Sequence, residues 1–180
     1  MNKIRMIALA ACMAATLDAS AQEQEIRLFS HRGGRMEHDE NTFSAFQASY
    51  DAGYRGFETD IRMTRDGALV ITHDSSLERT TDGTGTVEEK TEAEIRQLAT
   101  KQGNKMMFLD ELLEFLEGKE GLYVEFEMKT KPEALYPEER LHAYCDKLYD
   151  AVMAVKPADA TFVFTSGDYR GLRYLQAKHP

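Results

Sequence analysis

The chain is poor in cysteine, with only Cys12 and Cys145 among 180 residues. Cys12 lies in a stretch that we expect to be removed as a leader, so the mature chain would have no internal disulfide. Cys145 is then best interpreted as a buried, small apolar residue rather than as a reactive thiol.

Basic residues are also scarce relative to acidic ones, since 22 Lys and Arg stand against 31 Asp and Glu and give a net charge of −9. The basic surplus that nucleic-acid binding needs is missing, which excludes this class of partner. Beyond the leader, no apolar run is long enough to cross a bilayer. Without linkers, repeats or low-complexity segments, residues 22–180 fit one domain with a sizeable core.

Residues 1–21 have the pattern of a signal peptide. A basic start at Lys3 and Arg5 precedes an apolar stretch, and Ala19-Ser20-Ala21 forms a cleavage site. We therefore expect export, to the periplasm, with cleavage before Gln22. An alternative is a lipoprotein anchored through Cys12, because residues 9–12 resemble a lipobox.

Apolar patterns and turn residues predict strands that alternate with helices. The expected strands are residues 25–30, 57–63, 69–73, 122–128 and 161–165, and the expected helices are 42–52, 91–99, 110–116, 137–155 and 168–177. This alternation favours an α/β fold with a mainly parallel sheet. The exception is the Asp66-Gly67 turn, because two residues can join only antiparallel strands.

Polar residues gather where the expected strands end: His31, His73, Lys129 and Ser166. The carboxyl ends of strands are where α/β barrels carry their chemistry. Two histidines, a carboxylate pair and an arginine fall within His31-Arg32-Gly33-Gly34, Glu58-Thr59-Asp60 and His73-Asp74. Cleavage of a phosphodiester needs these groups as acid, base, cation ligands and phosphate contact.

The turn suggests how these groups meet. A two-residue turn places Arg65 opposite Ala68 and, counting back, Asp60 opposite His73. Side chains alternate along a strand, so Glu58, Asp60 and His73 would then share one face. Glu58 and Asp60 would form a chelating pair of the kind that suits Mg²⁺ or Ca²⁺. A bulge would turn these side chains to the other face.

Each motif taken alone also has a structural explanation. His31-Arg32 could be an exposed turn, and His73-Asp74 a capped strand end. Glu58 and Asp60 could lie on the solvent face of an amphipathic strand. Charged residues Glu125, Glu127 and Lys129 alternate on the next strand, which could be an edge strand with a wet face; otherwise their burial would require pairing or an ion. Residues 37–40 are most simply a solvated acidic loop.

Taken together, the ordered motifs resemble the glycerophosphodiester phosphodiesterase family, over most of residues 26–170. The matching blocks are His-Arg-Gly-Gly at 31–34, Glu-Asn-Thr at 40–42, Gly-Phe-Glu-Thr-Asp at 56–60, Thr-Arg-Asp-Gly at 64–67, His-Asp at 73–74, Leu-Glu-Arg-Thr-Thr at 77–81, Gly-Thr-Gly at 83–85 and Glu-Met-Lys at 127–129. Each block is weak alone, and their number and order make the resemblance specific.

The resemblance implies a TIM-barrel fold and metal-dependent hydrolysis of small glycerophosphodiesters to glycerol 3-phosphate and an alcohol. It implies an acid and base pair, a site for Mg²⁺ or Ca²⁺, and contacts to phosphate. The corresponding residues are His31 and His73 for proton transfer, Glu58, Asp60 and Glu127 for the metal, and Arg32 and Lys129 for the phosphate.

Two features depart from the family pattern. Asp39 stands where a proline usually precedes Glu-Asn-Thr, and we expect a looser loop there. A TIM barrel typically needs ~250 residues, whereas residues 22–180 offer about five of eight strand units and would form its N-terminal part. Two alternatives therefore remain: a phospholipase-type barrel enzyme that acts on intact lipid, and a non-catalytic segment that binds a phosphodiester or a metal.

Overall fold

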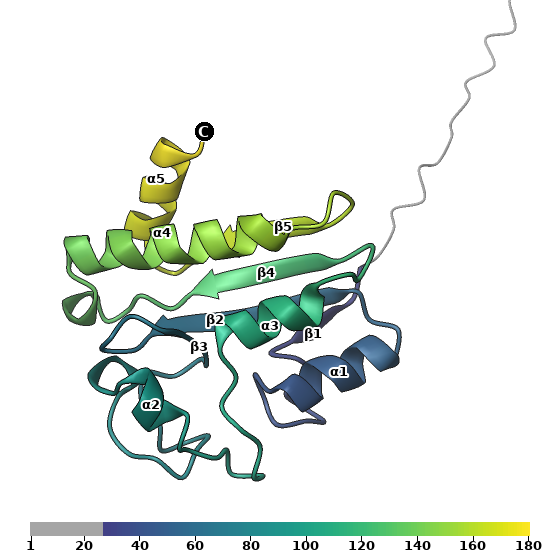
Figure 1. Cartoon of the computed structure of the whole chain (residues 1–180), viewed down its shortest axis with the longest axis horizontal. Helices are drawn as coiled ribbons and strands as arrows, with labels where there is room; N and C mark the ends of the chain where they lie inside the picture. Colours follow the sequence, from purple (N-terminus) through teal and green to yellow (C-terminus); the bar gives the residue numbers. More distant parts are fainter. Residues whose placement is uncertain (1–26) are drawn as a thin grey trace, which may run out of the picture.

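The computed structural model describes residues 27–180, and the expected signal peptide and the alternative lipid site at Cys12 lie outside the described residues. A five-stranded sheet forms the centre of the molecule (Figure 1). Four strands run parallel in the order β1-β2-β4-β5, and β3 pairs antiparallel with β2. Their bounds are Phe29–His31 (β1), Gly56–Met63 (β2), Leu69–Ile71 (β3), Tyr123–Met128 (β4) and Thr161–Thr165 (β5).

All five predicted helices are present, and all except the second lie close to their expected bounds. They are Phe43–Asp51 (α1), Glu92–Ile95 (α2), Leu109–Leu116 (α3), Glu138–Val155 (α4) and Tyr169–Lys178 (α5), with 3₁₀ turns at Val87–Glu89 (η1) and Glu133–Leu135 (η2). Thr91 and Glu94 form the capping box that the sequence indicates. Helix α2 ends at Ile95, four residues earlier than expected, and Ala99 instead forms a bridge with Lys105.

Helices α1, α3 and α4 lie over one face of the sheet (Figure 1). Alternate residues of β2 and β4 point toward these helices and form the core with them. The strands contribute Phe57, Ile61, Val124, Phe126 and Met128, and the helices contribute Phe46, Phe115 and Leu148. The residues between them point to the opposite face, which is therefore the face that carries the charged residues of both strands.

Helix α4 shows how the apolar spacing of the sequence becomes packing. Leu141, Tyr144, Cys145, Leu148 and Val152 are all buried, as their helical spacing predicts. Burial raises the pKa of the Cys145 thiol to about 12, which agrees with a packing role for this residue.

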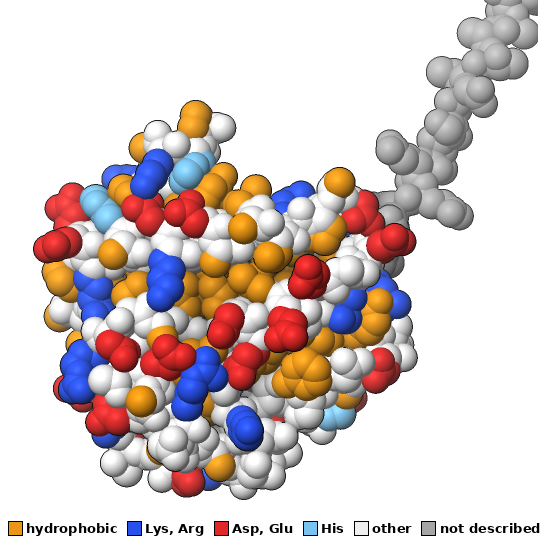
Figure 2. Space-filling model, in the orientation of Figure 1, with side chains coloured by type: hydrophobic (Ala, Val, Ile, Leu, Met, Phe, Trp, Pro, Cys, Tyr) orange, Lys and Arg blue, Asp and Glu red, His pale blue; other side chains and the backbone are white. Residues whose placement is uncertain are grey.

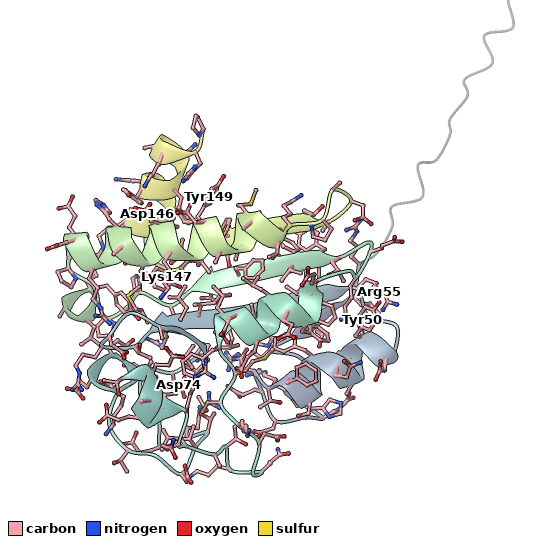
Figure 3. The ribbon with its side chains drawn as sticks, in the orientation of Figure 1. Tyr50, Arg55, Asp74, Asp146, Lys147 and Tyr149 are labelled. Atoms are coloured by element: carbon pink, nitrogen blue, oxygen red, sulfur yellow. The ribbon has the colours of Figure 1, made fainter. Side chains whose placement is uncertain are left out.

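The labelled side chains of Figure 3 show the two sides of α4. Tyr149 stacks on His179, and Asp146 accepts hydrogen bonds from Tyr174 and Lys178 in the C-terminal part of the chain. Lys147 points the other way, toward the hairpin, where its Nζ donates to the Gly67 carbonyl at 2.7 Å (Figure 3). The helix therefore joins α5 to the β2–β3 turn.

The turn between β2 and β3 has three residues, so the predicted two-residue turn is wrong. Thr64 N donates to Ala68 O at 2.8 Å, and Gly67 adopts a left-handed φ of 91°. This is the bulged type of hairpin loop that glycine at its third position favours. The Thr64 hydroxyl stabilises it by donating to Asp66 at 2.7 Å and accepting from Ala68 N at 2.8 Å.

The longer turn shifts the strand pairing by one residue. Ile61 pairs with Ile71, and Thr72 N donates to Asp60 O at 2.9 Å. Thr72 rather than His73 is thus opposite Asp60, and the predicted pairing of Asp60 with His73 is wrong. His73 reaches the site from just beyond the end of β3.

A close approach at the start of β2 depends on a glycine. Gly56 pairs with Phe29 of β1 and with Tyr123 of β4. The rings of Phe29 and Tyr123 meet edge to face across it, with centroids 4.9 Å apart. A Cβ on Gly56 would lie 2.6 Å from Leu28 O, so any side chain would force β1 away from β2.

The surface seen in Figure 2 has acidic and basic side chains interspersed over the helices. Among residues 27–180, no helix combines the length and the apolar character that a membrane span requires.

Candidate active site

Parallel strands bring the predicted site residues together at their carboxyl ends. His31 ends β1 and pairs in register with Glu58 of β2, while Asp60 pairs with Glu127 of β4. Lys129 directly follows β4. Because paired residues on neighbouring strands point to the same face, these side chains line one surface.

Three carboxylates form the centre of this surface. One oxygen from each of Glu58, Asp60 and Glu127 lies within 4.8 Å of the others. Burial, together with the negative charges of Asp60 and Glu127, raises the pKa of Glu58 to about 7. Glu58 Oε1 is buried without a hydrogen-bond donor. Clustered carboxylate oxygens repel one another, and they are the ligands that suit a bound divalent cation. These residues could therefore hold a metal ion.

Asp60 is the most constrained of the three. Its side chain is fully buried, and Asn41 Nδ2 donates to Oδ2 at 2.9 Å. Arg32 Nε lies 3.2 Å from Oδ2, and Lys129 Nζ lies 3.4 Å from Oδ1. Positive and polar groups on several sides thus fix the orientation of Asp60.

The two predicted phosphate ligands flank the carboxylates. Arg32 adopts a left-handed φ of 54°, and its backbone N–H donates to Glu58 Oε2 at 3.1 Å. Lys129 Nζ donates to Glu127 Oε1 at 2.9 Å. Both cations therefore lie beside the candidate metal ligands, where a phosphate bound to a cation would also lie.

The two predicted catalytic histidines face the same space. His31 Nε2 lies 3.5 Å from Glu58 Oε2, and nearly half of its side chain is exposed. Partial burial lowers the pKa of His31, and the positive charges of Arg32 and Arg35 lower it further. His73 Nδ1 is 2.6 Å from Asp74 Oδ1, which leaves Nε2 as the nitrogen that can exchange a proton with a substrate.

Structural explanations for two of the motifs are overturned. Every residue of β2 is buried, so Glu58 and Asp60 do not lie on a solvent face. Strand β4 pairs with β2 on one side and β5 on the other, so Glu127 does not belong to an edge strand. The two acids of β2 are therefore buried, where their charges need partners, while Glu127 lies on a central strand but remains partly exposed.

Glu40 was missed as a site residue, and the expectation of a solvated loop at residues 37–40 is wrong for it. Glu40 accepts from Arg32 Nη1 at 3.2 Å and from two nitrogens of Arg79 at 2.9 and 2.7 Å. Hydrogen bonds from Arg79 lower its pKa. Arg79 also pairs with Asp74, so Glu40 joins the His31 loop to the His73 loop. Its place in the Glu-Asn-Thr motif was the available signal.

The departure at Asp39 does not leave the loop loose. Asp39 Oδ2 accepts from Asn104 Nδ2 at 3.1 Å, and its carbonyl accepts from the Thr42 hydroxyl at 2.7 Å. The loop is therefore tied both to the start of α1 and to a segment 65 residues away in the sequence.

Acids and imidazoles at the carboxyl ends of parallel strands are typical of the active sites of α/β barrel enzymes. The chain matches the model of the glycerophosphoryl diester phosphodiesterase family over residues 31–180. It belongs to this family.

Curated relatives match over part of their length. A glycerophosphodiester phosphodiesterase of Caldanaerobacter subterraneus subsp. tengcongensis is 36% identical over 123 residues, which are 63% of this chain and 50% of the relative. Human glycerophosphodiester phosphodiesterase 1 is 42% identical over 73 residues, 41% of this chain and 22% of the relative. The chain thus spans half or less of these relatives.

Solved structures extend the comparison to the fold. The glycerophosphodiester phosphodiesterase of Agrobacterium tumefaciens aligns with a TM-score of 0.70 at 28% identity, over 87% of this chain and 64% of that one. An Oleispira antarctica phosphodiesterase, solved with the product sn-glycerol-3-phosphate, aligns with a TM-score of 0.75 at 26% identity, over 86% and 63%. These are TIM-barrel enzymes, and the five-stranded sheet corresponds to part of such a barrel.

Proposed function

We propose that the protein hydrolyses small glycerophosphodiesters to glycerol 3-phosphate and an alcohol, using Mg²⁺ or Ca²⁺. The observation that carries this proposal is the convergence of Glu58, Asp60 and Glu127, with an unpartnered buried oxygen on Glu58. The product complex of the Oleispira antarctica relative supports the substrate class.

The three carboxylates would hold the divalent cation, which would polarise the phosphoryl oxygens and stabilise the charge that builds on them. Arg32 and Lys129 would bind the phosphate from either side of this cluster. Arg32 offers a planar fork that matches phosphate oxygens, while Lys129 supplies a compact charge.

His31 and His73 would move the protons. One imidazole removes a proton from the attacking oxygen, and the other protonates the leaving alkoxide. Asp74 holds His73 by Nδ1, which would leave Nε2 to exchange a proton with the substrate. The lowered pKa of His31 favours its neutral form at neutral pH, which is the form that accepts a proton.

Release of glycerol 3-phosphate from glycerophosphocholine tests this function. We expect EDTA to abolish turnover, and Mg²⁺ or Ca²⁺ to restore it and so identify the metal. His31→Ala and His73→Ala should each lower kcat about 100-fold or more. Turnover that persists in chelator, or in His73→Ala, would contradict the mechanism.

Glu125→Gln is the matched control for the metal ligands. Glu125 lies on β4 two residues before Glu127 and pairs in register with Glu58. It offers the same chemistry on the same face, outside the cluster of three carboxylates. Glu127→Gln should weaken metal binding strongly, whereas Glu125→Gln should leave it close to that of the parent protein.

Two other functions remain as alternatives. A phospholipase-type enzyme would release a lipid or a cyclic phosphate from an intact phospholipid, so product analysis separates it from the proposed hydrolase. A segment that only binds would show metal uptake by calorimetry without turnover. The intact pair His31 and His73 favours catalysis.

We also propose that the protein is exported to the periplasm through the signal peptide at residues 1–21. Mass spectrometry of the secreted chain tests this proposal. A new terminus at Gln22 supports the signal peptide, whereas a lipidated terminus at Cys12 would support the lipoprotein alternative.

A further inference from the structure

A buried arginine links two segments that carry proposed site residues. Arg62 lies on β2, two residues beyond Asp60, and 7% of its side chain is exposed. Its Nε donates to His73 O at 2.9 Å. Its Nη1 donates to Lys129 O and to Lys131 O, each at 3.2 Å. One guanidinium thus contacts the main chain of both the histidine and the lysine.

A buried carboxylate balances this guanidinium. Glu88 on η1 accepts from Arg62 Nη1 at 2.7 Å, and its side chain is 2% exposed. Ser75 Oγ donates to Glu88 at 2.6 Å, and the Tyr136 hydroxyl donates to it at 3.0 Å. Both carboxylate oxygens of Glu88 therefore have donors, and its orientation toward Arg62 is fixed.

Stability alone does not account for such an arrangement. A buried ion pair costs desolvation, and apolar residues of similar volume often replace one without loss of stability. A planar fork with several donors can instead fix carbonyl groups from separate segments, which a lysine cannot do. His73 and Lys129 both lie just beyond their strands, β3 and β4, where pairing within the sheet gives way to loops.

We propose that Arg62 is a positioning residue, which sets the place of the His73 imidazole relative to the phosphate contact of Lys129. This inference rests on the proposed hydrolase function. Arg62 acts through the two main chains that it contacts and takes no part in the chemistry itself.

Arg62→Lys tests this role. A lysine keeps a positive charge beside Glu88 but cannot donate hydrogen bonds to both the His73 and the Lys129 carbonyl groups. A misplacement of about 1 Å can cost about 100-fold in rate. We expect kcat to fall about 10- to 100-fold in this variant. Metal affinity, measured by calorimetry, should stay within about 3-fold of the parent value, because Asn41, Arg32 and Lys129 still orient Asp60.

Arg140→Lys is the matched control. Arg140 Nη2 donates to Met63 O and Thr64 O at 2.9 Å each, at the end of the same strand. Its guanidinium therefore binds backbone near Arg62 and leaves the two site segments untouched. This control should change kcat less than 3-fold. An equal loss of kcat in both variants would overturn the positioning role.

Two further measurements keep the test decisive. If Arg62→Lys unfolds, the double variant Arg62→Met with Glu88→Met removes both buried charges, and it should fold and show the same loss of kcat. If the parent chain shows no turnover, the hydrolase proposal fails. The imidazole ¹H–¹⁵N spectrum of His73 still tests whether Arg62 sets the position of this side chain. Its signals should shift in Arg62→Lys and not in Arg140→Lys, and unchanged signals would overturn the inference.

Discussion

Asp74 shows how a single carboxylate can join several parts of the site. It lies in the loop that follows β3 (Figure 3) and bonds to His73 on one side and to Arg79 on the other. Partial burial disfavours its ionisation, yet hydrogen bonds from Arg79 and His73 outweigh burial and lower the pKa of Asp74 to about 2. Ionised Asp74 therefore stabilises the folded chain relative to the unfolded one.

This lowered pKa predicts a dependence of stability on pH. A carboxylate whose pKa is lower in the folded chain stabilises the fold above its unfolded pKa of about 3.9. That stabilisation is lost as the pH falls toward 2. We expect Asp74→Asn to lower the free energy of unfolding by about 1–2 kcal/mol at pH 6, a value reduced for partial exposure. Urea unfolding should show the two proteins converging below pH 4.

Thr84 provides a control in the same stretch of loop. Its side chain is exposed, and the partners of Asp74 are His73 and Arg79. Thr84→Ala should leave the difference between pH 6 and pH 3 unchanged. A pH profile of Asp74→Asn that runs parallel to that of the parent protein would contradict the assigned linkage.

The three clustered carboxylates predict that a divalent cation stabilises the fold. A ligand at 100 times its Kd stabilises the folded state by about 2.7 kcal/mol. Saturating Mg²⁺ or Ca²⁺ should therefore raise the melting temperature, and Glu58→Gln should remove most of that rise. Differential scanning calorimetry measures both, and this result does not depend on turnover. An equal rise in the Glu58→Gln variant would argue against the cluster as the metal site.

Among the elements, the β2–β3 hairpin has the clearest sequence cause. Gly67 needs a left-handed φ of 91°, and a Cβ there would meet nothing within 4 Å. The cost of any side chain is thus conformational rather than steric. Gly67→Ala should lower the free energy of unfolding by about 1 kcal/mol.

Gly167→Ala is the control for this substitution. A Cβ on Gly167 would also meet nothing within 4 Å, and this glycine is not among those with a positive φ. Chemical unfolding should show little change for Gly167→Ala and a clear loss for Gly67→Ala. Equal effects would show that the turn does not need the left-handed conformation.

The sequence predicted the elements better than their pairing. Turn residues and apolar spacing placed all five strands and all five helices, because these signals act over a few neighbouring residues. The hairpin register was missed by one residue, since Asp66-Gly67 fits both a two-residue loop and a three-residue loop. The hydroxyl of Thr64 selects the longer loop, and its choice depends on bonds that form only in the folded turn.

The candidate site was predictable where it lay in motifs, and the structure brings those residues together. Glu40 and Arg62 were not recognised because their partners are distant in the sequence. Arg79 is 39 residues from Glu40, and Lys129 is 67 residues from Arg62. Arg62 lies outside every motif and gives no local signal for its contacts, whereas the Glu-Asn-Thr motif marked the position of Glu40 but not its partners.

At the scale of the whole molecule, one thiol reports on the integrity of the fold. Cys145 is fully buried in the main core, and burial raises its pKa to about 12. In a Cys12→Ser background, we expect Cys145 to resist a thiol reagent at pH 8 and to react fully in urea, because only the thiolate is nucleophilic. Rapid reaction of the native protein would contradict the packing of α4 against the sheet.

The pairing of β1 with β2 at Gly56 has a consequence for how the chain can vary. Gly56 lies where the pairing of the two strands begins, two residue pairs before the histidine that ends β1. The Cβ of an alanine at position 56 would push the start of β1 away from β2 and change the direction of β1 toward its C-terminal end. The imidazole of His31 would swing away from Glu58 although neither residue had changed, so turnover could be lost by a substitution at the far end of the sheet.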